Sequence, residues 1–205
     1  MERRERALRM WDQRYSEPGY AYGTEPNDFL VSVIDRLPKG RVLCLGEGEG
    51  RNAVYLAQAG FDVTAVDASA VGLGKAEQLA ERHGVEISAV VSDLANFTIE
   101  PGAWQAVVSI FCHLSPAVRS AVHPAVVSGL APGGALVLEA FTPRQLELAT
   151  GGPRARELMM DLASLRAEFA GLRFAVAREI EREVIEGRYH TGAAAVVQML
   201  ALRDH

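Results

Sequence analysis

The run from Val42 to Asn52 constrains the fold of this 205-residue chain more than any other segment. It reads Val-Leu-Cys-Leu-Gly-Glu-Gly-Glu-Gly-Arg-Asn, which is typical of a buried strand that ends in a glycine-rich turn and leads directly into a helix. A second apolar run ends at Asp67, 21 positions after Gly46. This spacing predicts a parallel βαβ unit with a carboxylate at the tip of its second strand.

The same alternation continues along the chain. We expect strands at 41–45, 62–66, 86–91, 104–110 and 134–141, and helices at 51–59, 70–83, 117–129 and 156–169. Two further runs, 172–184 and 193–203, are predicted strands joined by a turn around Glu186-Gly187, and with no helix between them they must be antiparallel neighbours. The predicted fold class is α/β and Rossmann-like, with a seven-stranded, mostly parallel sheet, an antiparallel C-terminal hairpin and helices on both faces.

Composition and charge exclude several classes of protein. The chain is 49% hydrophobic and has no linker or repeat, so we expect a single domain over residues 1–205. A net charge of -5 argues against broad binding to nucleic acid or anionic membrane. The N-terminus lacks the apolar core of a signal peptide, so a cytoplasmic location is expected. Two cysteines, Cys44 and Cys112, do not make a disulfide framework or a metal site.

The glycine-rich turn predicts a site for a nucleoside-containing cofactor. Gly46 suits the sharp turn, Gly48 lets the backbone approach a ligand, and Gly50 opens the helix close against the strand. The spacing G-x-G-x-G differs from the dinucleotide fingerprint G-x-G-x-x-G. Glu47 and Glu49 also add carboxylates to the loop, which disfavours a pyrophosphate and favours a ligand that carries a sulfonium and an ammonium group.

Two strand-end aspartates extend this site. Asp67 stands where a carboxylate can accept hydrogen bonds from both ribose hydroxyls, although it could also cap the helix that begins near Ser69. Asp93, in the corner Ser92-Asp93-Leu94, can take a hydrogen bond from an adenine amino group while Leu94 packs on the ring. The alternative for Asp93 is an ordinary turn residue.

These residues resemble the class I S-adenosylmethionine-dependent methyltransferases, and in particular the small bacterial branch similar to tellurite-resistance and thiopurine methyltransferases. The resemblance lies in the loop 46–57, Asp67, the corner 92–94, Leu130-Ala131-Pro132-Gly133-Gly134 and the antiparallel hairpin. It implies S-adenosylmethionine as cofactor and S-adenosylhomocysteine as product. It also implies cofactor contacts by Asn52, Ala68, Ser92, Ile110 and Phe111.

The chain departs from this family at one position. The family usually has an acidic residue two positions before the first glycine, where this chain has Cys44, and often a cysteine where this chain has Glu47. The usual contact to the methionine ammonium is therefore missing, and Glu47 is the candidate replacement.

The resemblance divides the chain into an N-terminal helix and lid over 1–40, a cofactor-binding core over 41–141, and an acceptor-side helix and hairpin over 142–205. His113, behind the fourth strand, is a candidate general base, with a structural role as the alternative. The acceptor-side candidates are Trp11, Tyr15, Tyr22, Glu139, Phe141, Arg154 and Tyr189. Trp11 and Tyr15 could instead form one packed helical face, and Arg154 could be a solvated surface residue.

We expect a methyltransferase that moves a methyl group to a small-molecule acceptor by direct displacement, in which positioning and desolvation supply much of the acceleration. Little chain is left beyond the core to grip a protein or nucleic acid, and no membrane partner is expected. The oligomeric state, monomer or homodimer, stays open. The alternatives are a non-catalytic S-adenosylmethionine-binding protein and an NAD(P)-dependent oxidoreductase.

Overall fold

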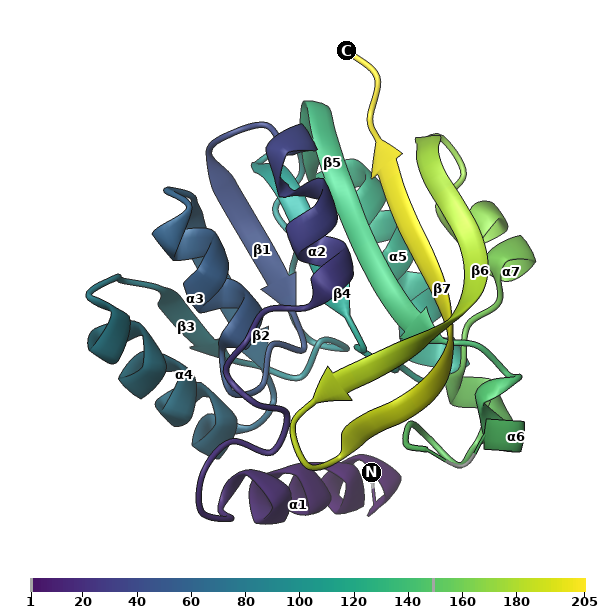
Figure 1. Ribbon diagram of the computed structural model, residues 1–205. Helices are drawn as coiled ribbons and strands as arrows, with labels where there is room; N and C mark the ends of the chain where they lie inside the picture. Colours follow the sequence, from purple (N-terminus) through teal and green to yellow (C-terminus); the bar gives the residue numbers. More distant parts are fainter. Residues whose placement is uncertain (1, 149) are drawn as a thin grey trace.

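The computed structural model describes residues 2–148 and 150–205, which form a seven-stranded sheet with helices on both faces (Figure 1). The strands are β1 (Arg41–Leu45), β2 (Asp62–Asp67), β3 (Ser88–Val91), β4 (Trp104–Ile110), β5 (Leu130–Phe141), β6 (Arg173–Glu186) and β7 (His190–Leu202). The helices are α1 (Glu2–Tyr15), α2 (Asp28–Val33), α3 (Arg51–Gln58), α4 (Ala70–His83), α5 (Pro116–Gly129), α6 (Gln145–Leu148) and α7 (Leu162–Glu168), with 3-10 turns η1 (Ile34–Arg36) and η2 (Arg156–Leu158).

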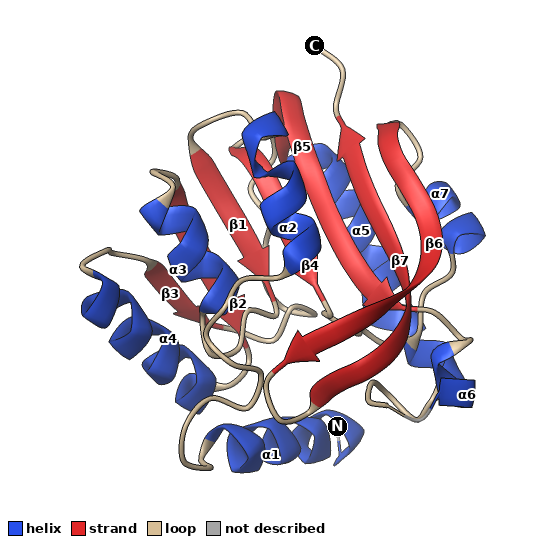
Figure 2. Ribbon diagram, viewed as in Figure 1, coloured by secondary structure: helices blue, strands red, loops and turns tan. Residues whose placement is uncertain are grey.

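The strand order is β3-β2-β1-β4-β5-β7-β6. Strands β1 to β5 pair in parallel, whereas β7 pairs antiparallel with both β5 and β6 (Figure 2). The predicted fold class is confirmed, including the antiparallel C-terminal hairpin. In Figure 1 the helices α2, α3 and α4 lie in front of the sheet, and α5 lies behind it.

The segment before the hairpin differs from the single helix predicted over 156–169. It consists of the turn η2 and the helix α7, separated by an extended stretch at Met159 and Met160. Met160 is buried, and its backbone N–H donates to the Phe141 carbonyl oxygen at 3.0 Å. Asp161 then caps α7 by accepting from the Ser164 N–H at 2.8 Å. The buried methionine and the cap together interrupt the helix.

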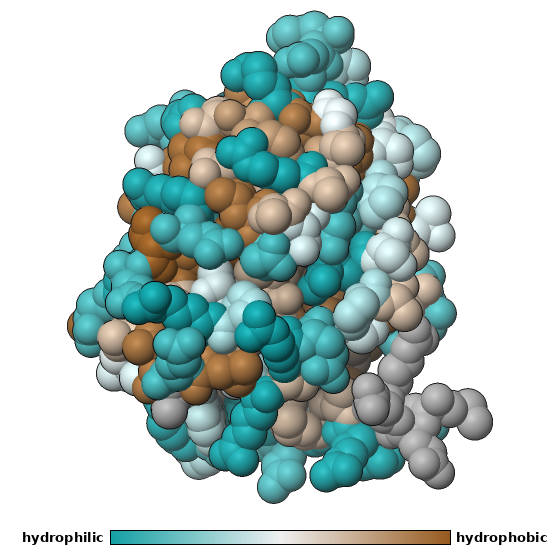
Figure 3. Space-filling model, turned by 90° about the vertical axis from the view of Figure 1, so that its right-hand side faces the viewer, coloured by the Kyte–Doolittle hydropathy of each residue, from teal (hydrophilic) through white to brown (hydrophobic). Residues whose placement is uncertain are grey.

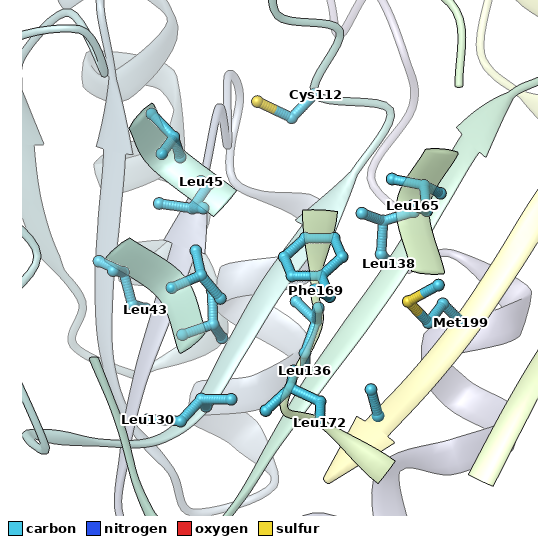
Figure 4. Close-up of a cluster of buried hydrophobic side chains, with 14 of the residues drawn as sticks. Leu43, Leu45, Cys112, Leu130, Leu136, Leu138, Leu165, Phe169, Leu172 and Met199 are labelled. Carbon is cyan, nitrogen blue, oxygen red and sulfur yellow. The ribbon is translucent and has the colours of Figure 1, made fainter. Parts of the chain in front are cut away.

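The alternating side chains of the strands make two apolar layers. On the face covered by α5 and α7, leucines of β1 and β5 pack against Leu165 and Phe169 (Figure 4). On the opposite face, Cys44 and Val137 pack against side chains of α2 and α3 such as Leu30. The strands are thus covered on both sides, as parallel sheets require.

Strand β6 is the outer edge of the sheet on the C-terminal side. Its middle carries a run of charged residues that includes Arg178 and Glu181, and such charges protect an open edge from pairing with other chains. Figure 3 shows that the molecular face on this side is mainly hydrophilic with scattered apolar patches. Within residues 2–148 and 150–205, no helix has both the length and the apolar character needed to cross a membrane.

The lid and the hairpin meet at the carboxyl ends of the parallel strands. Helix α1 and the β6–β7 turn lie beside these ends in the lower part of Figure 1. The Arg188 N–H donates to the Ala21 carbonyl oxygen at 2.9 Å, and the Tyr189 hydroxyl donates to the Glu17 carboxylate at 2.8 Å. Segments from opposite ends of the chain therefore enclose this edge of the sheet, where α/β proteins bind their ligands.

Candidate active site

The glycine-rich loop adopts a backbone that only glycine tolerates well. Gly46 and Gly48 both have φ of 63°. A Cβ on Gly46 would lie 2.7 Å from the Cys112 sulfur, and one on Gly48 would lie 2.5 Å from the Tyr15 hydroxyl oxygen. The loop is therefore packed tightly between β4 and the lid helix α1.

Glu47 turns back onto the helix that follows the loop. Its Oε1 accepts hydrogen bonds from the backbone N–H groups of Asn52 at 3.0 Å and Ala53 at 2.8 Å. Burial raises the pKa of Glu47 to about 7. The carboxyl group also interacts with the Cys44 thiol, so it reaches the position where related enzymes carry their acid. It takes the anion position at the α3 N-terminus that a dinucleotide pyrophosphate would need.

Glu49, the second loop glutamate, holds the lid. Its Oε2 accepts from the Ala21 N–H at 2.7 Å, and its Oε1 pairs with Lys75 at 2.9 Å. Lys75 also donates to the Gly19 carbonyl oxygen at 2.6 Å. Glu47 therefore lies at the turn itself, whereas Glu49 joins the loop to residues 19–21.

Asp67 lies beside the glycine loop at the end of β2. Its Oδ2 accepts from the Gly48 N–H at 2.9 Å, and its Oδ1 accepts from the Ser69 N–H at 2.8 Å. The cap of α4 is Ser69, whose hydroxyl accepts from the Gly72 N–H. Burial raises the pKa of Asp67, against the hydrogen bonds that favour its charged form. The Ala68 N–H also interacts with this carboxylate. A carboxylate has about four acceptor sites, so Asp67 keeps the capacity to accept a hydrogen bond from a ligand hydroxyl.

The corner after β3 lies next to this aspartate along the sheet edge, since the Ser92 N–H donates to the Asp67 carbonyl oxygen at 2.8 Å. Asp93 accepts from the Ala95 N–H through Oδ1 at 2.9 Å, which gives it the turn role that the sequence left open. Leu94 is buried, and Ala68 is half-buried. The corner therefore places an apolar side chain and a carboxylate next to each other, a combination that suits an adenine ring.

Six side chains form an aromatic cluster beyond β4 and β5: Tyr22, Phe111, His113, Phe141, Tyr189 and His190. Phe111 is 4.6 Å from Phe141 and 4.7 Å from His190, measured between ring centroids. Among the described residues other than glycine, only Phe111 has a positive φ, 51°. Strain of this kind in a bulky residue is typical of functional sites.

Helix α1 covers both parts of the site. Tyr15 is buried against Gly48 and stacks on Trp11 with a centroid distance of 5.6 Å. Arg14 donates to the Tyr22 hydroxyl at 2.6 Å and lies 4.4 Å from the centre of the Tyr189 ring. Tyr15, predicted on the acceptor side, thus lies on the glycine loop, whereas Arg14 lies beside the aromatic cluster.

His113 is held by the backbone at both ring nitrogens. Nδ1 is 3.0 Å from the Leu158 carbonyl oxygen, and Nε2 accepts from the Phe141 N–H at 3.4 Å. Burial lowers the pKa of His113 to about 4. These contacts favour the structural role that was the alternative for His113: it joins the end of β5 to the η2 segment.

Glu139 and Arg154 lie in contrasting surroundings. Arg154 is exposed. Glu139 is fully buried and accepts hydrogen bonds from Arg182 at 2.6 Å and from Gln198 at 2.7 Å. Burial raises the pKa of Glu139, against the charge of Arg182. A buried charge in an apolar strand needs a partner, and for Glu139 the hairpin supplies it rather than an open acceptor pocket.

Glu139 is part of a buried polar network that the sequence analysis missed: Asn27, Arg51, Glu139, Arg182, Glu186 and Gln198. Glu186 accepts from Arg51 at 2.7 Å and from Asn27 at 2.9 Å. The Asn27 N–H in turn donates to the Asn52 side-chain oxygen at 2.9 Å. The network joins the hairpin, the lid and helix α3. The charge of Glu139 in an apolar strand was the one sequence signal for it.

The residues on this edge fit a nucleoside cofactor with a positively charged tail. Asp67 suits the ribose, the corner at Asp93 and Leu94 suits the adenine, and the loop at Gly46 to Gly48 suits the methionine end. Glu47 opposes a pyrophosphate at the same place. In the described part of the chain, no cluster of three or more histidine, cysteine or carboxylate side chains is placed to hold a metal ion.

Comparison with known proteins finds methyltransferases among the similar sequences and structures. Residues 42–134 match a family described as a methyltransferase domain. A 2-heptyl-1-hydroxyquinolin-4(1H)-one methyltransferase of Mycobacteroides abscessus is 24% identical over 145 residues, which cover 69% of this chain and 64% of that protein. The aligned stretch is therefore less than two thirds of the relative's length.

Solved structures share the fold over nearly the whole chain. One, from a study of the conversion of a disulfide bond into a thioacetal group during echinomycin biosynthesis, has a TM-score of 0.78 and 20% identity, and covers 97% of this chain and 93% of its own. TehB from Haemophilus influenzae has a TM-score of 0.72 and 18% identity, with 96% and 67% covered. The N-methyltransferase NodS from Bradyrhizobium japonicum has a TM-score of 0.67 and 15% identity, with 86% and 93% covered.

The chain has the class I methyltransferase fold, and its residues 42–134 match a methyltransferase domain. The resemblance to class I S-adenosylmethionine-dependent methyltransferases predicted from the sequence is confirmed, with TehB among the similar structures.

Proposed function

We propose that this chain transfers the methyl group of S-adenosylmethionine to a flat aromatic small molecule that carries an acidic hydroxyl or thiol group. The observation that carries the proposal is the aromatic cluster next to the glycine loop. Phe111, which has a positive φ, contacts both Phe141 and His190. Rings packed in this way offer faces and edges on which a flat acceptor can stack.

The cofactor supplies an activated methyl group on a sulfonium, which leaves as a neutral thioether. The protein's part is to bind, orient and exclude water. We propose that Asp67 holds the ribose, that Leu94 and Ile110 flank the adenine with Asp93 at its amino group, and that Ala68, Ser92 and Asn52 complete the contacts. Trp11, Tyr22 and Tyr189 would close over the acceptor.

The relative from Mycobacteroides abscessus supports the acceptor class, because its name describes an aromatic bicyclic molecule with a hydroxyl group. The charge balance of the site agrees with this. Glu47 and Asp67 favour a cationic cofactor, and Arg14 lies against the aromatic cluster, where it favours an acceptor that becomes an anion.

The test is a methyl-transfer assay with purified full-length protein, S-adenosylmethionine and a panel of phenols, thiophenols, hydroxyquinolones, aliphatic amines and tellurite. We expect S-adenosylhomocysteine to form with aromatic hydroxyls or thiols. Calorimetric titration with S-adenosylmethionine and with NADH runs beside it. Binding of S-adenosylmethionine without turnover of any acceptor would favour a non-catalytic binder, and binding of NADH alone would favour an oxidoreductase.

A further inference from the structure

The first residue of β7, His190, is a buried histidine that the fold does not use as an ordinary hydrogen-bond partner. It is 9% exposed. Its Nδ1 lies 3.5 Å from Oε2 of Glu186, four residues earlier across the hairpin turn. This distance is at the outer limit of a hydrogen bond, and within residues 2–148 and 150–205 Nδ1 has no shorter partner. A buried polar atom without a partner calls for a functional explanation.

The ring of His190 stands inside the aromatic cluster. Its centroid is 4.6 Å from that of Tyr22, 4.7 Å from that of Phe111 and 5.1 Å from that of Phe141. These three rings come from the lid, the end of β4 and the end of β5. His190 therefore belongs to the aromatic cluster against which the proposed function places the acceptor.

We infer that His190, oriented by Glu186, accepts the proton of the acceptor's hydroxyl or thiol group, so that this chain methylates acceptors that enter the site in their protonated form. The inference rests on the proposed function. It assigns the proton transfer to a residue that lies just after the hairpin turn predicted around Glu186-Gly187. Glu186 is a positioning residue in this arrangement, because it acts through His190.

The step balances without any further reactant. The O–H or S–H bond of the acceptor breaks and its proton passes to Nε2 of His190, while the electron pair left behind forms the bond to the methyl carbon. The carbon–sulfur bond breaks with its electron pair on sulfur, so one positive charge is lost at sulfur and one is gained on the imidazole. The imidazolium then releases its proton to solvent.

The charges around His190 suit this cycle. Burial alone would raise the pKa of Glu186, but His190 and Arg51 lower it to about 2, so the carboxylate stays charged. Burial lowers the pKa of His190, with Glu186 opposing and the charges of Arg51 and Arg14 adding to the effect. His113 is the other titratable group that acts on it. The imidazole is therefore neutral at pH 7, and Glu186 is there to stabilise the transient imidazolium.

Two other histidines, His113 and His123, can be compared with His190. His113 has both ring nitrogens engaged by the backbone, so it is the poorer proton acceptor although it lies in the same cluster. His123 on α5 is buried and lies 2.6 Å from Glu168, on the far face of the sheet beside Phe169. His123→Asn is thus a matched control that removes a buried histidine beside a carboxylate away from the site.

The first measurement needs no variant. 4-Nitrophenol is added to wild-type protein that holds S-adenosylhomocysteine, at a pH where the free phenol is protonated, and the absorbance of the bound phenol is recorded. We expect the nitrophenolate spectrum, because the imidazolium that forms on His190 lies between Glu186 and the phenolate, and these two negative charges offset the burial that lowers its pKa. His190→Asn, whose amide can still face Glu186, should return the phenol spectrum, and His123→Asn should behave as wild type. A protonated bound phenol in the wild type would overturn the inference.

The second measurement compares methyl transfer to a series of phenols of increasing acidity at one pH. His190→Asn should lower kcat about 100-fold for phenols that are protonated in solution and have little effect for those already ionised. An equal loss for both groups would show a packing role and overturn the inference. If His190→Asn does not fold, His190→Gln takes its place. Failure of every phenol and thiophenol with wild-type protein would instead count against the proposed function.

Discussion

The side chains on the two faces of the sheet differ as the strands approach the site. On the α5 and α7 face, β5 presents Leu136, Leu138 and then Ala140, all buried among apolar side chains. On the α2 and α3 face, Val137 is followed two positions later by Glu139, which enters the buried polar network. Apolar packing stabilises the fold, whereas a buried ion pair is often no more stabilising than the apolar residues that could replace it. The first face therefore supplies stability, and the second joins the lid, the hairpin and α3 around the site.

The largest expected effect tests the apolar face. Phe169→Ala removes a fully buried ring that stacks on His123 and should lower the free energy of unfolding by about 4 kcal/mol. Urea unfolding followed by circular dichroism measures it. Below the melting transition, calorimetry should give unchanged affinity for S-adenosylmethionine. An affinity that falls with stability would break the division between the two faces.

Glu139→Ala tests the polar face. The substitution leaves Gln198 without its carboxylate and removes the shortest ion pair of Arg182, which keeps Glu186 and Asp28 as partners. We expect a loss of about 3 kcal/mol in the free energy of unfolding, at the low end for breaking a buried pair. The matched control is Glu181→Ala on β6, which breaks an exposed pair with Arg144 and should change stability by less than about 0.5 kcal/mol. Similar losses in both variants would contradict the role given to the network.

The sequence predicted the fold because each strand and helix carries its own pattern of apolar residues. Asp67 was predictable for the same reason, since its place depends on a short βα unit. The polar network was not, because Asn27 and Glu186 are 159 positions apart and meet only when the lid packs on the hairpin. Glu139 showed that a partner was needed but not which one. Glu47 is similar, because only the loop backbone shows that its carboxyl group turns back to cap α3.

Glu47→Gln tests the polar face through the pH dependence of the free energy of unfolding. Burial raises the pKa of Glu47 from 4.5 to about 7, so the folded state binds the proton more tightly than the unfolded state. The stability contributed by this group is complete below pH 4.5 and is lost as the pH rises through about 7. The free energy of unfolding of Glu47→Gln, relative to wild type, should therefore increase by about 3 kcal/mol from the acid end to pH ~8.

Urea unfolding of both proteins across this pH range measures the difference. Glutamine keeps an oxygen for the Asn52 and Ala53 N–H groups, so the cap itself is preserved. A difference that does not vary with pH would show that the pKa of Glu47 is the same in the folded and unfolded states, as it would be if the helix N-terminus offset its burial. In that case Glu47 would add a full negative charge to the polar face at neutral pH.

The smallest expected effect concerns binding alone. Asp67→Ala should weaken the affinity for S-adenosylmethionine by about 2–3 kcal/mol, because two ribose hydroxyls lose their acceptor. Asp62→Ala, at the opposite, exposed end of β2, is the control and should bind as wild type. Asp67→Asn separates two causes of the loss. Its remaining side-chain oxygen can still accept from the Gly48 N–H, so recovered affinity would mean that the loop conformation alone matters. Affinity that stays low would mean that the cofactor needs both oxygens of the carboxylate, which is the role assigned to Asp67.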